Sequence, residues 1–339
     1  MRACHDRLVS GVDLATQLRR VADREGFAGV VRVQVDGTEV AAFAQGYADR
    51  STSRPNNLDT RFAIASGTKG LTALTIMSLV ADGELELDTL VSDVVGDVLP
   101  VVDSGVTIDH LLTHRSGVGD YLDEETLGDI DDHVLGDLSP HVLTAPSAYL
   151  RLLNRYPQRN APGEVFAYNN SGYVILSIVI EQVSGNFHRE VQSRVLDPAG
   201  MKRSGFFRTD NLPGDVALGY LEDGRSNVFH LPVIGAGDGG AYMSVADAES
   251  LWRGLAQDWI VSHDAVDQMM TAVTTRPNQS AYGRGFWMDD LADHVWLEGM
   301  DAGVSFQTGW VKSKKMTYTV LANTSAGAWP LARTITAFE

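Results

Sequence analysis

The chain has 339 residues, and 44% of them are apolar, so it is long enough to bury a large core and a disordered chain is not expected. Its formal net charge of -17 argues against electrostatic binding to nucleic acid or to anionic lipid, because binding to either requires a basic surface. The single cysteine, Cys4, cannot form a disulfide within the chain and offers no multi-cysteine metal site.

The first predicted elements are a helix and a hairpin. Residues 11–25 have helical spacing, and residues 29–49 are typical of two strands joined by the Asp36-Gly37 turn signal. The N-terminal segment contains no apolar run as long as a signal-peptide core, and no later stretch approaches the roughly 20 apolar residues of a membrane span. We therefore expect a cytoplasmic protein with no membrane partner.

Helices are predicted in the middle of the chain and strands in its final third. The apolar spacing indicates helices at 66–80, 170–183 and 245–257, and from residue 282 onward it indicates a series of strands closed by a short helix at 329–338. The fold expected is α+β, with one antiparallel sheet built from N- and C-terminal strands, flanked by helices and carrying an inserted, mostly helical domain.

This arrangement predicts a division into two parts. Residues 1–62 together with 215–339 form the expected sheet domain, and residues 63–214 form the inserted helical domain. A site for a small molecule is expected at the junction of the two, because ligand sites tend to lie between domains.

The segment FAIASGTKGLTAL carries the first candidate chemistry. It places Ser66 at the start of a helix and Lys69 one turn later on the same side, so that hydroxyl and amine are within plausible reach. Burial and the positive helix terminus disfavour the ammonium form, which would let Lys69 accept the proton of a nucleophilic Ser66. The spacing alone also fits an ordinary helix cap followed by a solvated lysine.

The chain as a whole resembles the serine β-lactamase and penicillin-binding protein superfamily, in its class C β-lactamase-like branch, which includes esterases and D-aminopeptidases. The resemblance runs in the family's order through DTRFAIASGTKGLTAL, TIDHLLTHRSGV, PGEVFAYNNSGYVIL, LDPAGM and GAGDGGAYMSVAD to the final strands. It implies the β-lactamase/transpeptidase-like fold and an acyl-enzyme on Ser66.

The same resemblance implies two further catalytic residues. Tyr168-Asn169-Asn170 matches the family's Tyr-x-Asn, in which the tyrosine shuttles a proton and the asparagine orients the lysine and the substrate. Tyr168 and Asn170 are therefore expected beside Ser66 and Lys69. Whether lysine or tyrosine is the formal base stays open, because two such groups titrate as a pair.

The third family element departs from the pattern. Where class C enzymes carry Lys-Thr-Gly and many related esterases carry His-x-Gly, this chain has Leu297-Glu298-Gly299. Gly299 would let substrate lie along the strand, and the backbone N–H groups of Ser66 and Met300 would form the oxyanion hole. The cation is missing, so we expect carboxylate-bearing substrates to bind weakly. Glu298 either meets a protonated amine of the substrate or points to solvent.

Two other patterns point to different classes of protein. The GAGDGG segment at residues 235–240 fits a dinucleotide-binding fingerprint, but Pro232 interrupts the entry and no clear βαβ partner follows. His110 and His114 have a spacing that is compatible with zinc binding, yet the sequence does not match the H-E-x-x-H pattern of zinc-binding helices. We therefore expect neither a cofactor nor a metal.

Together these observations predict a serine hydrolase acting on a small-molecule ester or amide. A carboxylesterase on small esters is the first expectation, followed by a D-amino-acid amidase or aminopeptidase and then a β-lactamase. The alternative from another functional class is a non-catalytic binding module that has the same fold. The sequence leaves the oligomeric state open.

Overall fold

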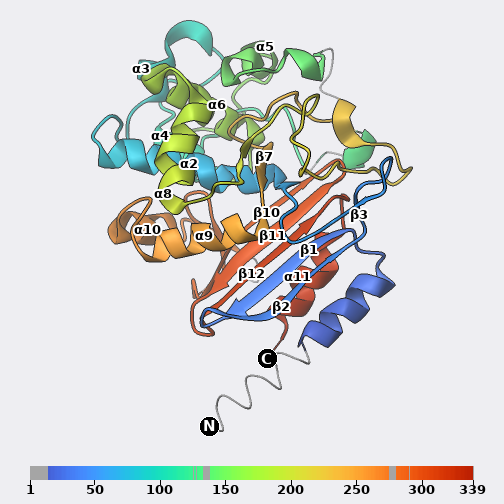
Figure 1. Cartoon of the computed structure of the whole chain (residues 1–339). Helices are drawn as coiled ribbons and strands as arrows, with labels where there is room; N and C mark the ends of the chain where they lie inside the picture. Colours follow the sequence, from blue (N-terminus) through green and yellow to red (C-terminus); the bar gives the residue numbers. More distant parts are fainter. Residues whose placement is uncertain are drawn as a thin grey trace.

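A computed structural model describes residues 14–124, 126, 128–132, 138–274, 280–289 and 291–338. Its centre is an antiparallel sheet of seven strands in the order β2-β1-β12-β11-β10-β9-β8 (Figure 1). The strands are β1 (Gly29–Val35), β2 (Thr38–Gln45), β8 (Ala281–Tyr282), β9 (Trp287–Met288), β10 (His294–Asp301), β11 (Val304–Val311) and β12 (Met316–Ala322). The N- and C-terminal strands meet where β1 pairs with β12, which confirms the predicted sheet.

The hairpin of β1 and β2 shows why its turn forms where the sequence indicates. Asp36 and Gly37 both have positive φ, at 51° and 72°, the left-handed conformation that a two-residue hairpin turn requires. Asparagine, aspartate and glycine tolerate this conformation better than other residues do. The Asp36-Gly37 pair therefore sets the register next to the turn, and the pairing shifts by one residue between Val33 and Gln34.

Each face of the sheet covers a separate core. Helix α11 (Ala328–Thr336) and the helical residues 14–24 pack on one face, burying a cluster that includes Val31 and Val33 (Figure 1). The other face holds the larger core, shared with Val30 and with helices α2 (Thr68–Ala81), α6 (Asn170–Ser184) and α9 (Val245–Ala256). This alternation follows from the two-residue period of a strand.

The remaining elements complete the helical layer and two small sheets. The helices are α3 (Val91–Val95), α4 (Ile108–Leu112), α5 (Leu150–Leu153), α7 (Phe187–Val191), α8 (Asp197–Ala199) and α10 (His263–Met269). β3 (Tyr47–Asp49) pairs with β4 (Arg54–Pro55), and β7 (Ala241–Met243) lies between β5 (Phe62–Ala63) and β6 (Gly205–Phe206).

The fold matches the predicted class, an antiparallel sheet with helices on both faces and a helical region between its strands. The division at residues 62/63 and 214/215 stays a prediction. Its first part includes residues 1–13, which lie outside the described residues. Among the described residues, none of the helices is long and apolar enough to cross a bilayer.

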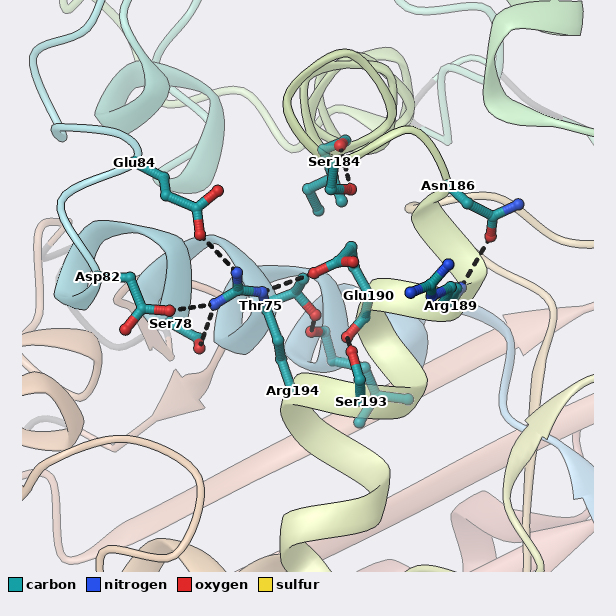
Figure 2. Close-up of polar contacts among 12 residues, drawn as sticks. Thr75, Ser78, Asp82, Glu84, Ser184, Asn186, Arg189, Glu190, Ser193 and Arg194 are labelled. Carbon is teal, nitrogen blue, oxygen red and sulfur yellow. Dashed lines mark hydrogen bonds and ion pairs between the residues drawn. The ribbon is translucent and has the colours of Figure 1, made fainter.

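The C-terminal end of α2 is fixed by an arginine on a neighbouring helix. A π-helical turn, η6 (Gln192–Leu196), follows α7 and carries Arg194. The guanidinium of Arg194 lies 2.7 Å from a carboxylate oxygen of Glu190 and 2.6 Å from those of Asp82 and Glu84, as Figure 2 shows. Burial lowers the pKa of Arg194, but hydrogen bonds to the three carboxylates outweigh it and raise the pKa above its usual range, so the guanidinium stays charged. The contacts tie α7 and η6 to the end of α2.

Candidate active site

Ser66 lies in a strained turn between β5 and α2. It is the middle residue of the 3₁₀ turn η1 (Ala65–Gly67), and the preceding Ala65 has a φ of 44°, in the left-handed region that alanine rarely adopts. The predicted helix therefore begins at Thr68 rather than at Ser66. Strain of this kind often accompanies functional residues, since the surrounding fold must hold the conformation in place.

Lys69, in the first turn of α2, is buried and makes three polar contacts. Its Nζ lies 2.8 Å from Ser66 Oγ, 2.7 Å from Asn170 Oδ1 and 2.9 Å from the backbone oxygen of Asp238. Burial lowers the pKa of Lys69, while the nearby carboxylate of Asp238 opposes that shift. The structure thus brings together the serine and lysine that the sequence singled out.

Asn170 begins α6 and presents its amide oxygen to Lys69. Its Nδ2 donates to the backbone oxygen of Leu122 at 2.7 Å and to a carboxylate oxygen of Glu124 at 3.2 Å. Both partners only accept, so the amide can be oriented in one way, with Oδ1 facing the lysine. The Asp120 carboxylate accepts from the backbone N–H groups of Asn170 and Ser171, each at 2.9 Å, and fixes the start of α6. Burial raises the pKa of Asp120 to about 6.

Tyr168 completes the predicted group. Its phenol lies beside the side chain of Ser66, and Lys69 Nζ lies 4.9 Å from the centre of its ring. The ring stacks on Trp287 with 5.9 Å between centroids and lies 4.4 Å from the ring of His114. Burial raises the pKa of Tyr168 well above its usual range, although the Ser66 hydroxyl lowers it. The resting phenol is therefore neutral.

The two histidines that suggested zinc make structural contacts. His110 Nδ1 accepts from the N–H of Thr107 at 3.2 Å and so caps α4. His114 Nδ1 accepts from the N–H of Asn169 at 3.0 Å, while its Nε2 is buried without a hydrogen-bond partner among the described residues. Burial lowers the pKa of His114 well below its usual value, so it supports Tyr168 as a neutral ring. The described parts of the chain contain no group of three or more His, Cys, Asp or Glu residues placed to hold a metal.

The third predicted motif lies on β10, directly against η1 and α2. Leu297 is buried and touches Gly70, where an added Cβ would come within 2.6 Å of the leucine side chain. A Cβ on Gly299 would lie only 2.6 Å from the backbone nitrogen of Ser66. Glycine is required at this position because the strand backbone meets the nucleophile's turn without room for a side chain.

Glu298, for which the sequence left two roles open, forms hydrogen bonds within the sheet. Its carboxylate accepts from Trp296 Nε1 at 3.0 Å and from Gln307 Nε2 at 2.9 Å. Neither Glu298 nor its neighbours Leu297 and Gly299 line the cavity beside Ser66. Side chains alternate along a strand, so Glu298 is directed away from the face that carries Leu297. Asp301, three residues further on, lies in the cavity wall instead.

A cavity of about 120 Å³ opens beside Ser66. Its wall includes Ser66, Asn170 and Met300, so it joins the predicted nucleophile, the amide that contacts Lys69 and the residue predicted to complete the oxyanion hole. Three acidic residues also line it: Glu124, Asp238 and Asp301. Lys and Arg residues are absent from its described lining. The cavity is therefore small and acidic.

The glycine-rich segment at residues 235–240 forms one wall of this cavity. A Cβ on Gly237 would come within 2.2 Å of the backbone oxygen of Tyr173, which shows how closely the segment approaches α6. The backbone oxygen of Gly237 accepts from Thr72 Oγ1 at 2.8 Å, next to the contact between Lys69 and Asp238. These glycines serve close packing against the helices of the site.

Sequence reasoning missed the acidic residues of the site. Asp120, Glu124, Asp238 and Asp301 come from separate segments, and nothing in their spacing shows that they meet. Asp238 offered one signal, because it lies within the glycine-rich segment that the resemblance includes. Asp301 offered another, since it closes the strand that begins before Leu297.

The site combines a serine in the turn before a helix, a buried lysine in the first turn of that helix and a tyrosine from the helical layer. Together with the close approach of a glycine on the antiparallel sheet, these features define a serine hydrolase of the β-lactamase fold. The chain matches the Beta-lactamase family over residues 14–337 and belongs to it.

Relatives of several activities share this family. A penicillin-binding protein from Bacillus halodurans has a solved structure that is 36% identical, covers 95% of this chain and all of that one, and superimposes with a TM-score of 0.89. Esterase EstB of Burkholderia gladioli is 37% identical over 48% of this chain and 43% of its own length. A D-aminopeptidase of Brucella anthropi is 32% identical over 59% of this chain and 36% of its own. The chain thus spans less than half the length of these two enzymes.

Proposed function

We propose that this protein is a carboxylesterase that hydrolyses small esters through an acyl-enzyme on Ser66. The proposal rests on the three polar contacts of Lys69 Nζ. Two of the three atoms around its Nζ, the amide oxygen of Asn170 and the backbone oxygen of Asp238, can only accept hydrogen bonds. A neutral amine has two N–H donors for these oxygens, and its lone pair is then directed at the third partner, Ser66 Oγ at 2.8 Å.

The pKa shifts of Lys69 and Tyr168 favour the same path for the proton of Ser66. Burial disfavours both the ammonium of Lys69 and the phenolate of Tyr168, so the resting pair is an amine and a phenol. The amine accepts the serine proton as Ser66 Oγ attacks the ester carbonyl. Tyr168, which lies beside Ser66, then protonates the departing alkoxide and takes up the proton from the ammonium. In the second half of the cycle the same groups activate the water that releases the acid.

The developing oxyanion needs donors beside Ser66. The backbone N–H of Ser66 and that of Met300 on β10 are the proposed pair, in accord with the close approach of β10 at Gly299. The 3₁₀ turn holds the nucleophile against this strand. Charge stabilisation of this kind is commonly the largest single contribution to acyl transfer.

The cavity determines the preference among substrates. Its small volume favours a short acyl group, and its acidic lining without Lys or Arg repels the free carboxylate found in β-lactams and in peptidoglycan stems. The β-lactamase activity is therefore the weakest of the three candidates. The acidic lining also supports a second candidate, an amidase or aminopeptidase for D-amino-acid substrates, because their free amine is a cation.

The test is turnover of matched panels by wild type and Ser66→Ala. The panels are p-nitrophenyl esters of rising chain length, D- and L-aminoacyl p-nitroanilides and nitrocefin, together with a fluorophosphonate probe for the serine. Short esters cleaved by wild type alone would support the esterase, whereas D-aminoacyl anilides cleaved faster would favour the second candidate. Rapid nitrocefin cleavage would contradict the argument from charge. A wild type that neither turns over any panel nor takes up the probe would favour a binding module.

A further inference from the structure

Each of the three acids of the cavity has one carboxylate oxygen that accepts a hydrogen bond. The Tyr121 hydroxyl donates to Asp238 Oδ2, so that carboxylate has a partner. Glu124, exposed at the rim, accepts from Asn170 Nδ2 at 3.2 Å. Asp301 Oδ1 accepts from the adjacent N–H of Ala302 at 2.8 Å, and the structure gives Oδ2 no hydrogen-bond donor among the described residues. Each acid thus keeps one oxygen without a donor among the described residues, and Asp301 is the one of the three that lies on β10 next to the turn of Ser66.

The position of Asp301 relative to the nucleophile follows from β10. A Cβ on Gly299 would lie 2.6 Å from the backbone nitrogen of Ser66. Asp301 is two residues further along the same strand, hence on the same face and about 6 to 7 Å away at the rise of an extended chain. This separation matches an acyl group of two or three carbons between the scissile carbonyl and a charged substituent.

We propose that Asp301, assisted by Glu124 at the rim, binds an ammonium group of the substrate and makes the enzyme selective for small esters or amides whose acyl group carries a cation. This inference rests on the proposed acyl transfer at Ser66. The free Oδ2 of Asp301 accepts from the ammonium, and the second carboxylate adds attraction. A charged hydrogen bond in a poorly hydrated site accounts for a selectivity of about 10- to 100-fold.

The protonation of Asp301 gives the selectivity a pH dependence. Burial raises the pKa of Asp301 to about 7, with the carboxylates of Asp238 and Glu124 acting in the same direction. The acid is therefore neutral below about pH 7 and charged above it. The backbone N–H of Ala302 opposes this shift, and Lys69 opposes it whenever its side chain is charged. The preference for a cationic substrate should grow as the pH rises through 7.

The experiment compares two p-nitrophenyl esters of nearly equal shape, the β-alanyl ester with its ammonium and the butyryl ester with a methyl group in that place. Their kcat/KM ratio is measured for wild type, Asp301→Asn and Asp267→Asn. Asp267, a 68% exposed acid on α10, is the control for the loss of one negative charge. At about pH 8 we expect wild type and the control to favour the cationic ester, and Asp301→Asn to lower that ratio about 10- to 100-fold.

Two further arms keep the inference testable if Asp301→Asn does not fold. In wild type the ratio should fall as the pH is lowered to about 6, and Glu124→Gln should lower it in the same direction by a smaller factor. Hydrolysis of the butyryl ester with an equal ratio in wild type and Asp301→Asn, or with no change of ratio between about pH 6 and 8, would overturn this inference alone. If wild type cleaves neither ester and the fluorophosphonate probe does not label Ser66, the proposed hydrolase itself fails.

Discussion

Replacing Gly299 by alanine tests the contact between β10 and the nucleophile's turn. The added Cβ would lie 2.3 Å from the backbone oxygen of Ile64 and 2.6 Å from the backbone nitrogen of Ser66. Contacts of a real Cβ stay above roughly 3.0 Å, so the strand and the turn must separate by about 0.7 to 1 Å. Both neighbours are backbone atoms, which no side-chain rotation can relieve.

A separation of this size should act mainly on the chemical step. A displacement of about 1 Å in a catalytic arrangement costs on the order of 100-fold in rate, and losing one oxyanion donor costs about 100- to 1,000-fold. We expect Gly299→Ala to lower kcat for a short p-nitrophenyl ester about 100-fold, with a smaller change in KM. Labelling by a fluorophosphonate should slow in parallel, since its phosphoryl oxygen needs the same donors.

The matched control is Gly214→Ala, because an added Cβ there meets nothing within 4 Å. The assays are steady-state kinetics, the rate of probe labelling and the melting temperature. The control should keep wild-type values in all three. If Gly299→Ala keeps kcat within threefold of wild type, with an unchanged labelling rate, the proposed role of the β10 edge in the oxyanion hole is refuted.

Two other substitutions separate the roles of neighbouring residues. Tyr168→Phe should lower kcat about 100- to 10,000-fold because it removes a proton donor and acceptor, yet leave the fold intact; stopped-flow kinetics with an unchanged rate would disprove the proton shuttle. Arg194→Met should lower the melting temperature by about 2 to 6 °C because it leaves three carboxylates together without their cation. Arg208→Met, which removes an exposed surface pair with Asp210, should show no measurable shift in calorimetry, and an equal shift would contradict the argument.

The parts of this protein that the sequence determines are those encoded locally. The Asp36-Gly37 hairpin, the helix after Ser66 and the helix that begins at Asn170 all follow from turn residues and apolar spacing, which act between near neighbours. The observed ends of α6, α9 and α11 lie within two residues of the predicted ones. The rest of the fold was predicted from the resemblance to the family, because the matching segments occur in the family's order.

The site could be predicted only where its residues share one helix or one motif. Ser66 and Lys69 are three residues apart, so the 3₁₀ turn and the first turn of α2 bring them together locally. Tyr168 and Asn170 lie about a hundred residues further on, and the resemblance rather than any local pattern placed them in the site. Their contacts with Lys69 depend on the packing of α6 against α2.

The acids of the cavity show what only the tertiary structure decided. Glu298 and Asp301 belong to one strand, and the sequence drew attention to Glu298 because it stands in the motif position, while leaving open whether it meets a substrate amine or solvent. The structure directs Glu298 to Trp296 and Gln307 and places Asp301 in the cavity wall. The face that a strand residue occupies depends on which side of the sheet the neighbouring helices cover, and that arrangement arises from contacts between residues far apart in the chain.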